Sequence, residues 1–383
     1  MNIRKALVVT TALTAVGTLA SGAALAAEKP KVSIGGYYEL YFGISDQDDP
    51  AGALSTNGTP VYDSGSAVNR FGIVHYGEVH ITAQGVTDSG MKWRVRFEDV
   101  QDDRDIGIYT SPSQTAKKVS TDEAWVELTG SWGRLIMGGQ DGPADAWEGG
   151  SDLVYTGARE HAIFADINAG FVSGADKTNL EDSSDATKIY YSTPRIAGFR
   201  ANYSYSPEGE ATGSVNRNAT DGGSGGPFHE ASIEYRGKVG NDVMLNLNLK
   251  GARYEQPDPV TSLDDTNDVW GLSGNVTFGP WTFAAGYVDN GEKDGSTDAK
   301  AWDVGVAFNG GKWEASLTYL ESKAEDPATG NDDEYNQWVV SGAYNLGGGM
   351  SVAASLYFFD LDAPSASETT DGWAGVVKTS FRF

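Results

Sequence analysis

The chain has 383 residues, with 53 acidic side chains against 28 Lys and Arg and a formal net charge of −25 at pH 7. This acidity argues against nucleic acid as a partner, because binding a polyphosphate requires a basic surface. The 10 Trp, 18 Tyr and 14 Phe argue against a solvated, disordered chain. Because the chain has no Cys, disulfides and thiolate metal sites are excluded, so the fold must be stabilised by packing or strand pairing.

The N-terminus has the pattern of a secretory signal peptide. Arg4 and Lys5 precede an Ala-rich apolar run, and residues 24–26 (Ala-Leu-Ala) supply the small residues of a cleavage site. The apolar run is shorter than the roughly 20 residues that a membrane-spanning helix needs. We therefore predict a cleaved signal peptide at 1–26 and an exported mature domain at 27–383.

After the signal peptide, the dominant pattern is an alternation of apolar with polar or small residues. It begins at 32–44 and recurs at 91–98, 243–250, 302–308 and 313–319. Such segments are typical of β-strands with one apolar face. A transmembrane β-barrel needs only this, since each strand shows one face to lipid and the other to water. No later segment is apolar for long enough to form a transmembrane helix.

The connections between these strands fall into two classes that alternate along the chain. Short turns rich in Gly or Pro lie near 87–90, 129–133, 193–198, 237–242, 278–280, 309–312 and 346–350. Longer polar loops lie near 45–69, 101–120, 141–187, 207–227, 255–267, 289–299, 323–333 and 361–371. About seven turns and eight loops predict an all-β, antiparallel transmembrane barrel of about sixteen strands, with short periplasmic turns and long external loops.

Aromatic residues concentrate at the ends of the predicted strands. The set beside short turns is Trp132, Phe278, Trp281, Phe308, Trp313 and Tyr344. The set towards long loops is Tyr287, Trp302, Tyr319, Trp338, Phe358 and Trp373. Trp and Tyr favour the membrane–water interface, whereas the core of a soluble sandwich would not place them at strand ends. The pattern therefore indicates two aromatic belts.

Charged residues occur on the polar faces of several predicted strands. The sharpest cluster is Lys92, Arg94 and Arg96, which alternate with large apolar residues on one strand. Because the apolar face must meet lipid, these cations must face the lumen. The candidate pore-lining residues on strands are Glu39, Glu78, Lys92, Arg94, Arg96 and Arg134.

Four short stretches resemble a known family. The ending 381–383 (Phe-Arg-Phe) is similar to the C-terminal signature of outer-membrane barrels. Residues 122–134 (DEAWVELTGSWGR), 139–142 (GQDG) and 190–194 (YYSTP) resemble trimeric general porins of Gram-negative bacteria, especially those of alphaproteobacterial type. The resemblance covers essentially the whole mature chain.

The resemblance implies a homotrimer of sixteen-stranded barrels in the outer membrane, in which the third external loop, about 141–187, folds into the lumen and narrows it. Acidic residues of this loop would then face the wall cations, and a transverse field of this kind orients dipolar solutes. The alternative is a solvated lumen with ordinary salt bridges. The loop candidates are Asp141, Asp145, Glu148, Asp152 and Glu160.

The implied function is passive diffusion of small hydrophilic solutes and ions across a membrane of lipid and lipopolysaccharide. A channel selective for one solute, a barrel enzyme and an adhesin are the alternatives. We predict no enzymatic activity, since none of the four His (75, 80, 161 and 229) lies in a recognisable Ser, His and carboxylate arrangement. Motifs for nucleotide binding or zincin chemistry are absent from the sequence.

Acidic clusters in the predicted loops could hold Ca²⁺ or Mg²⁺ through oxygen ligands, although solvated charge is the simpler interpretation. The clusters are Asp46, Asp48 and Asp49; Glu181, Asp182 and Asp185; Asp264, Asp265 and Asp268; and Asp332, Asp333 and Glu334. No cofactor is required by any motif. The net acidity predicts mild cation selectivity, against a local wall charge that is positive.

Overall fold

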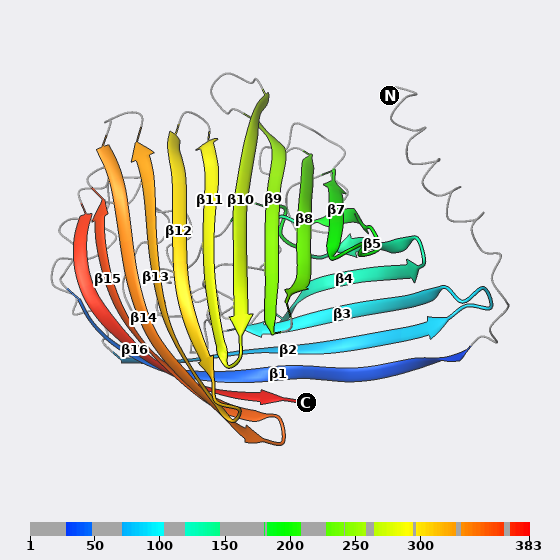
Figure 1. Cartoon of the computed structure of the whole chain (residues 1–383), viewed down its shortest axis with the longest axis horizontal. Helices are drawn as coiled ribbons and strands as arrows, with labels where there is room; N and C mark the ends of the chain where they lie inside the picture. The colour runs from blue at the N-terminus through cyan, green and yellow to red at the C-terminus, as the bar shows by residue number, and fades with distance from the viewer. Residues whose placement is uncertain are drawn as a thin grey trace.

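The computed structural model describes residues 28–47, 71–102, 119–145, 180, 182–207, 227–240, 242–257, 264–293, 296–326, 331–363 and 368–383. These residues form sixteen strands in one closed antiparallel barrel, which confirms the predicted fold (Figure 1). Across the described ranges, no helix is both long and apolar enough to cross a membrane. The predicted signal peptide lies outside the described residues.

The strands follow one another around the barrel in chain order. They are β1 (Glu28–Gln47), β2 (Phe71–Val86), β3 (Lys92–Asp102), β4 (Val119–Gly130), β5 (Gly133–Gly139), β6 (Thr187–Ser192), β7 (Phe199–Ser206), β8 (Phe228–Val239), β9 (Val243–Pro257), β10 (Asp264–Phe278), β11 (Trp281–Lys293), β12 (Ser296–Asn309), β13 (Trp313–Asp326), β14 (Asn331–Gly347), β15 (Met350–Ala363) and β16 (Glu368–Arg382).

The C-terminus closes the barrel against the first strand. β1 pairs with β16 from Tyr37 opposite Arg382 onward. The Gly36 amide donates to the Phe383 carbonyl oxygen at 3.0 Å, and the Phe383 amide donates to the Gly36 carbonyl oxygen at 3.1 Å. A Cβ on Gly36 would lie 2.1 Å from the backbone oxygen of Glu78, so the close approach requires glycine. Closure removes the free sheet edge, which no barrel in lipid can retain.

The predicted short turns are all present, but several predicted loops are too long. β10 already contains Asp264–Asp268, and β14 contains Asp332–Glu334. Asp265 pairs with Gln256 on β9, and Glu334 pairs with Lys323 on β13. Polar composition predicted loops here, yet backbone pairing does not depend on apolar side chains, so the ladder continues past the apolar zone. The connections near 255–267, 289–299, 323–333 and 361–371 are correspondingly shorter than predicted.

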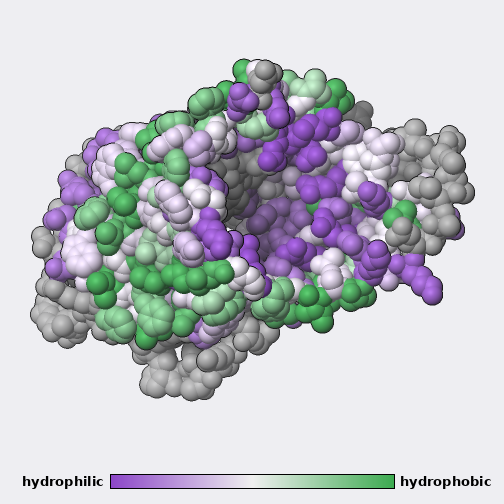
Figure 2. Space-filling model, turned by 60° about the horizontal axis from the view of Figure 1, so that its bottom comes forward, coloured by the Kyte–Doolittle hydropathy of each residue, from purple (hydrophilic) through white to green (hydrophobic). Residues whose placement is uncertain are grey.

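The outer surface carries the apolar faces of the strands, whereas a hollow in the molecule has a hydrophilic wall (Figure 2). Large apolar side chains such as Val32, Ile34 and Phe283 are 69%, 70% and 55% exposed. In a water-soluble protein the exposure of so much apolar surface to water would be unfavourable. Such a surface is expected where the solvent outside is hydrocarbon.

The two predicted aromatic belts are present on the outer face. Near the short turns, the rings of Trp281 and Phe308 lie 4.7 Å apart, and those of Phe308 and Trp313 lie 5.1 Å apart. Towards the other rim, a second row is formed by register neighbours. This row contains Tyr287 opposite Trp302, Tyr319 opposite Trp338, and Phe358 opposite Trp373. The belts mark the two interfaces of the membrane-spanning zone.

The inward faces are less uniformly polar than the alternation predicts. Tyr335, Leu361 and Val339 belong to a buried apolar cluster on β1 and β13–β16. A second cluster joins Ala144 and Leu180, from the two ends of the third loop, to inward residues of β8–β12 such as Phe228. Parts of the lumen are therefore filled with packed side chains rather than water.

Two neighbouring positions on β9 test the assignment of faces. Leu247 points outward between the two belts, and Asn246 points inward. Leu247→Arg should lower the free energy of unfolding by about 2–4 kcal/mol, because it places a charge in hydrocarbon. Asn246→Arg should cost clearly less, because the lumen solvates the charge. Urea titration of protein folded into lipid vesicles measures both, and equal costs would contradict the assignment.

Candidate functional site

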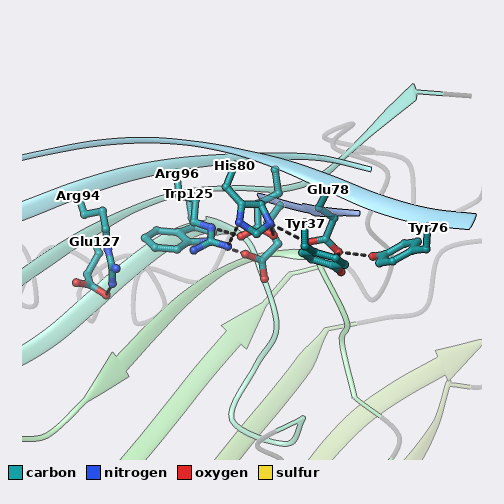
Figure 3. A network of polar contacts seen from close by, with 10 residues as sticks. Tyr37, Tyr76, Glu78, His80, Arg94, Arg96, Trp125 and Glu127 are labelled. Atoms are coloured by element: carbon teal, nitrogen blue, oxygen red, sulfur yellow. Dashed lines mark hydrogen bonds and ion pairs between the residues drawn. The ribbon is translucent and has the colours of Figure 1, made fainter. Parts of the chain in front are cut away.

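The wall cations predicted from sequence lie on the inward faces of β3 and β5. Arg94 Nη2 lies 2.9 Å from Glu127 Oε2 on β4, and the same oxygen lies 3.7 Å from Arg134 Nη1. The Arg94 guanidinium also stacks over the Trp125 ring, 5.1 Å from its centroid. One carboxylate thus holds two guanidinium groups, and the local charge remains positive. Figure 3 shows the pair of Arg94 and Glu127.

Further from the short turns, the same wall carries a network around His80. His80 Nε2 lies 2.7 Å from Glu78 Oε2 and 3.4 Å from Glu98 Oε2. Tyr37 donates to Glu78 Oε1 at 2.6 Å, and Tyr76 also donates to that oxygen. Arg96 pairs with Glu98. Figure 3 shows this network and the Arg94 pair in one row along the wall.

The ligand atoms of Glu78, His80 and Glu98 lie within 4.8 Å of one another, a spacing that could suit a metal ion. Arg96 argues against this use. Its Nη2 lies 3.1 Å from His80 Nδ1, and because a guanidinium only donates, Nδ1 must be the acceptor. The proton of neutral His80 is then on Nε2, the atom that faces both carboxylates. The geometry is that of a hydrogen-bonded lumen wall, not of a metal centre.

Glu39 lies at the seam where the barrel closes. Lys378 Nζ on β16 lies 3.1 Å from Glu39 Oε1, and Ser380 and Tyr41 both donate to the same carboxylate. These contacts join β1 to β16 from inside the lumen. Glu39 thus lies on the inner wall and makes a structural contact at the seam.

Both ends of the third loop lie inside the barrel. Ala144 and Leu180 are 0% and 1% exposed, packed against inward side chains of the opposite strands. Glu230 on β8 accepts hydrogen bonds from the Ser183 amide at 2.7 Å, the Ala144 amide at 3.4 Å and Ser204 Oγ at 3.2 Å. One buried carboxylate on β8 therefore holds the beginning and the end of the loop against the inner wall.

Glycine at position 142 is required by this attachment. A Cβ on Gly142 would lie 1.4 Å from Glu230 Oε2, closer than any side chain could tolerate. Gly142 is the last residue of the GQDG motif. One of the motifs that carry the family resemblance thus lies where the beginning of the loop is attached to Glu230.

Carboxylates gather where the loop ends meet the wall. Glu123, Asp141 and Asp185 hold carboxylate oxygens within 4.8 Å of one another. Burial, and then the neighbouring Asp141 carboxylate, raise the pKa of Asp185 to about 7. Burial also raises the pKa of Asp182 to about 6 and that of Asp141 above its usual range. Lys188 is the nearby cation, and it donates to the Gln140 and Ser184 carbonyl oxygens.

The predicted pore-lining residues are only partly brought together. The structure places Glu39, Glu78, Lys92, Arg94, Arg96 and Arg134 on the inner wall of β1–β5, and Asp141 and Asp145 at the inner end of the third loop. Asp141 lies beside Glu123, not opposite Arg94. Glu148, Asp152 and Glu160 lie outside the described residues.

Sequence reasoning missed several inner-wall charges. They are Glu98, Glu123, Glu127, Lys188 and Glu230. The alternation places Glu98 on the same face of β3 as the three cations, so the signal for this residue was present in the sequence. Glu230 could not have been singled out, because its role depends on contacts with residues far away in the sequence.

The Gly142 contact generates a double-substitution test. Gly142→Ala should lower the free energy of unfolding by about 1–3 kcal/mol, the usual cost of overpacking. Glu230→Ala removes the atom that the new methyl group strikes. The double variant should therefore lose clearly less than the two single losses added together, measured by urea titration in vesicles. Strict additivity would show that the two residues do not touch.

Comparisons with known proteins agree with this architecture. The sequence matches the family described as Gram-negative porin over residues 10–364. Among curated proteins, no relative matches the chain by sequence.

Several solved structures share the fold. The anion-selective porin from Comamonas acidovorans aligns with a TM-score of 0.62 at 15% identity, covering 93% of this chain and 100% of that one. Salmonella typhi OmpF in complex with daunomycin aligns with a TM-score of 0.63 at 12% identity, covering 92% and 98%. In-vitro folded OmpT of Vibrio cholerae, in its trimer form, aligns with a TM-score of 0.57 at 13% identity, covering 93% and 100%.

The family match spans most of the chain, and the structural matches span nearly all of it. With the closed barrel, the apolar outer surface and the charged inner wall, they identify a channel rather than an enzyme. The chain belongs to the Gram-negative porin family and forms an outer-membrane porin channel.

Proposed function

We propose that this porin is a passive channel for small hydrophilic solutes and ions, narrowed where the ends of the third loop meet the inner wall. The observation that carries the proposal is the attachment of that loop inside the barrel, through Glu230 and through the packing of Ala144 and Leu180. A polar opening of fixed size sorts solutes by radius and charge, and the solute's own gradient supplies the driving force.

The channel is mildly cation-selective in this proposal. Glu123 and the ionised fractions of Asp141 and Asp185 supply negative charge at the loop ends, and the positive cluster around Arg94 lies nearer the short turns. A cation crossing the lumen meets the carboxylates in the narrowed zone, where low-dielectric walls strengthen the field. The wall arginines reduce this selectivity without reversing it.

Assembly and export complete the proposal. OmpT of Vibrio cholerae, which shares the fold, has a trimer form, and the family resemblance implies the same for this chain. We propose a homotrimer surrounded by lipid and lipopolysaccharide, exported by a cleaved signal peptide at 1–26.

Binding of calcium or magnesium is a secondary proposal. The oxygen spacing of Glu123, Asp141 and Asp185 suits it better than the outer acidic clusters, since Asp268 and Glu334 are engaged by Arg253 and Lys323.

Planar-bilayer recordings in a salt gradient test the function. The wild-type protein should give large, stepwise currents and a reversal potential that indicates mild cation preference. Arg94→Gln with Arg96→Gln should raise the cation-to-anion permeability ratio by about two- to fivefold, because two fixed positive charges leave the wall.

Arg253→Gln is the matched control, since this exposed arginine lies on the outer face beside Asp268 and should leave the reversal potential unchanged. A silent protein would refute the channel. Clear anion preference in the wild type would refute the proposed selectivity, and an unchanged ratio in the double variant would show that Arg94 and Arg96 do not border the ion path.

A further inference from the structure

A cationic pocket lies at the periplasmic end of the charged wall. It has a volume of about 410 Å³ and is lined by residues of β1–β4. Its charged lining consists of Lys29, Lys31, Lys92, Arg94 and Glu127. It is separate from the carboxylates at the loop ends.

Strand register fixes the position of the pocket. Lys31 pairs with Gln84, Gln84 with Arg94, and Arg94 with Glu127, so four neighbouring strands contribute to one row. Lys92 follows the short turn after β2, which is closed by hydrogen bonds of 2.9 Å between Thr87 and both Gly90 and Met91. Short turns mark the periplasmic side of such barrels. The pocket therefore opens at the periplasmic mouth of the lumen.

The charge of the pocket is strongly unbalanced. Four of its lining side chains are cationic, and Glu127 is the carboxylate among them. Glu127 is already engaged by Arg94 and Arg134. Among the described side chains, Lys29, Lys31 and Lys92 have no acidic partner. Three free ammonium groups, two on β1 and one on β3, thus converge on one space.

The chemistry of the lining fits a phosphate monoester. Ammonium groups bind phosphate oxygens as point charges, and a guanidinium binds them through a planar set of donors. The volume lies within the range of pockets that hold small ligands and exceeds what a lone phosphate ion needs. Gln84 and Thr129 add neutral hydrogen-bonding groups that suit the hydroxyls of a polar remainder.

We propose that this pocket binds small phosphorylated solutes carrying two negative charges, as a weak site at the periplasmic mouth. The proposal rests on the proposed function, because the solute reaches the pocket through the lumen. The carboxylates at the loop ends repel the same anions that the pocket attracts. A phosphorylated solute therefore meets a repelling zone and a binding zone along the same lumen.

Isothermal titration calorimetry of the full-length protein in detergent, at low ionic strength, tests the site. Glucose 6-phosphate is the probe, and glucose is the uncharged control. The wild type should bind the probe saturably and glucose not at all. Lys31→Gln with Lys92→Gln should weaken binding at least about tenfold, since each charge contributes roughly three- to tenfold toward a dianion in a water-filled lumen. Lys31→Arg with Lys92→Arg should restore it.

The matched control is Lys238→Gln with Lys312→Gln, which removes the same charge near other short turns of the same mouth. This variant should bind as the wild type does. Equal weakening in both glutamine variants, or no saturable binding in the wild type, overturns the site. Single-channel conductance of the same preparations separates the two proposals, because conduction without binding refutes the pocket alone, whereas absent conduction refutes the channel.

Discussion

The structure depends on one constraint, which is that a backbone in hydrocarbon must satisfy its hydrogen bonds within the protein. β1 and β16 meet through the Gly36 and Phe383 amides and carbonyls, so the sheet has no free edge. Closure fixes the two faces of every strand, and the period of two residues then decides which side chains meet lipid and which meet the lumen. The aromatic belts and the charged inner wall both follow from this assignment.

The lumen itself is organised by a few buried charges. Glu127 holds Arg94 and Arg134 near the periplasmic mouth, whereas Glu230 fastens the third loop further in. Positive charge thus lies towards the short turns and carboxylates lie at the loop ends. The electric field in the lumen therefore varies along the path of the solute as well as across it. A simple pairing of acidic loop residues with wall cations would produce only the transverse part.

The fold was predictable from sequence because its signals are local. Alternation, turn residues and the terminal Phe383 each act over a few positions, and together they gave the closed barrel and the faces of Arg94 and Arg96. Strand ends were less predictable, since polar segments such as Asp264–Asp268 continue the ladder. The site was predictable only in part. The Glu230 contact with Gly142 joins distant segments, and no local pattern encodes it.

The most direct test of the central claim is to measure which side chains along β3 are accessible to water. The chain has no Cys, so single cysteines can be introduced at Lys92, Arg94 and Arg96, and at Val95 and Phe97, without background. In vesicles, a membrane-impermeant thiol reagent should label the first three positions and spare the other two. Uniform labelling, or labelling of Val95 and Phe97 in place of the charged positions, would contradict the assignment of the two faces.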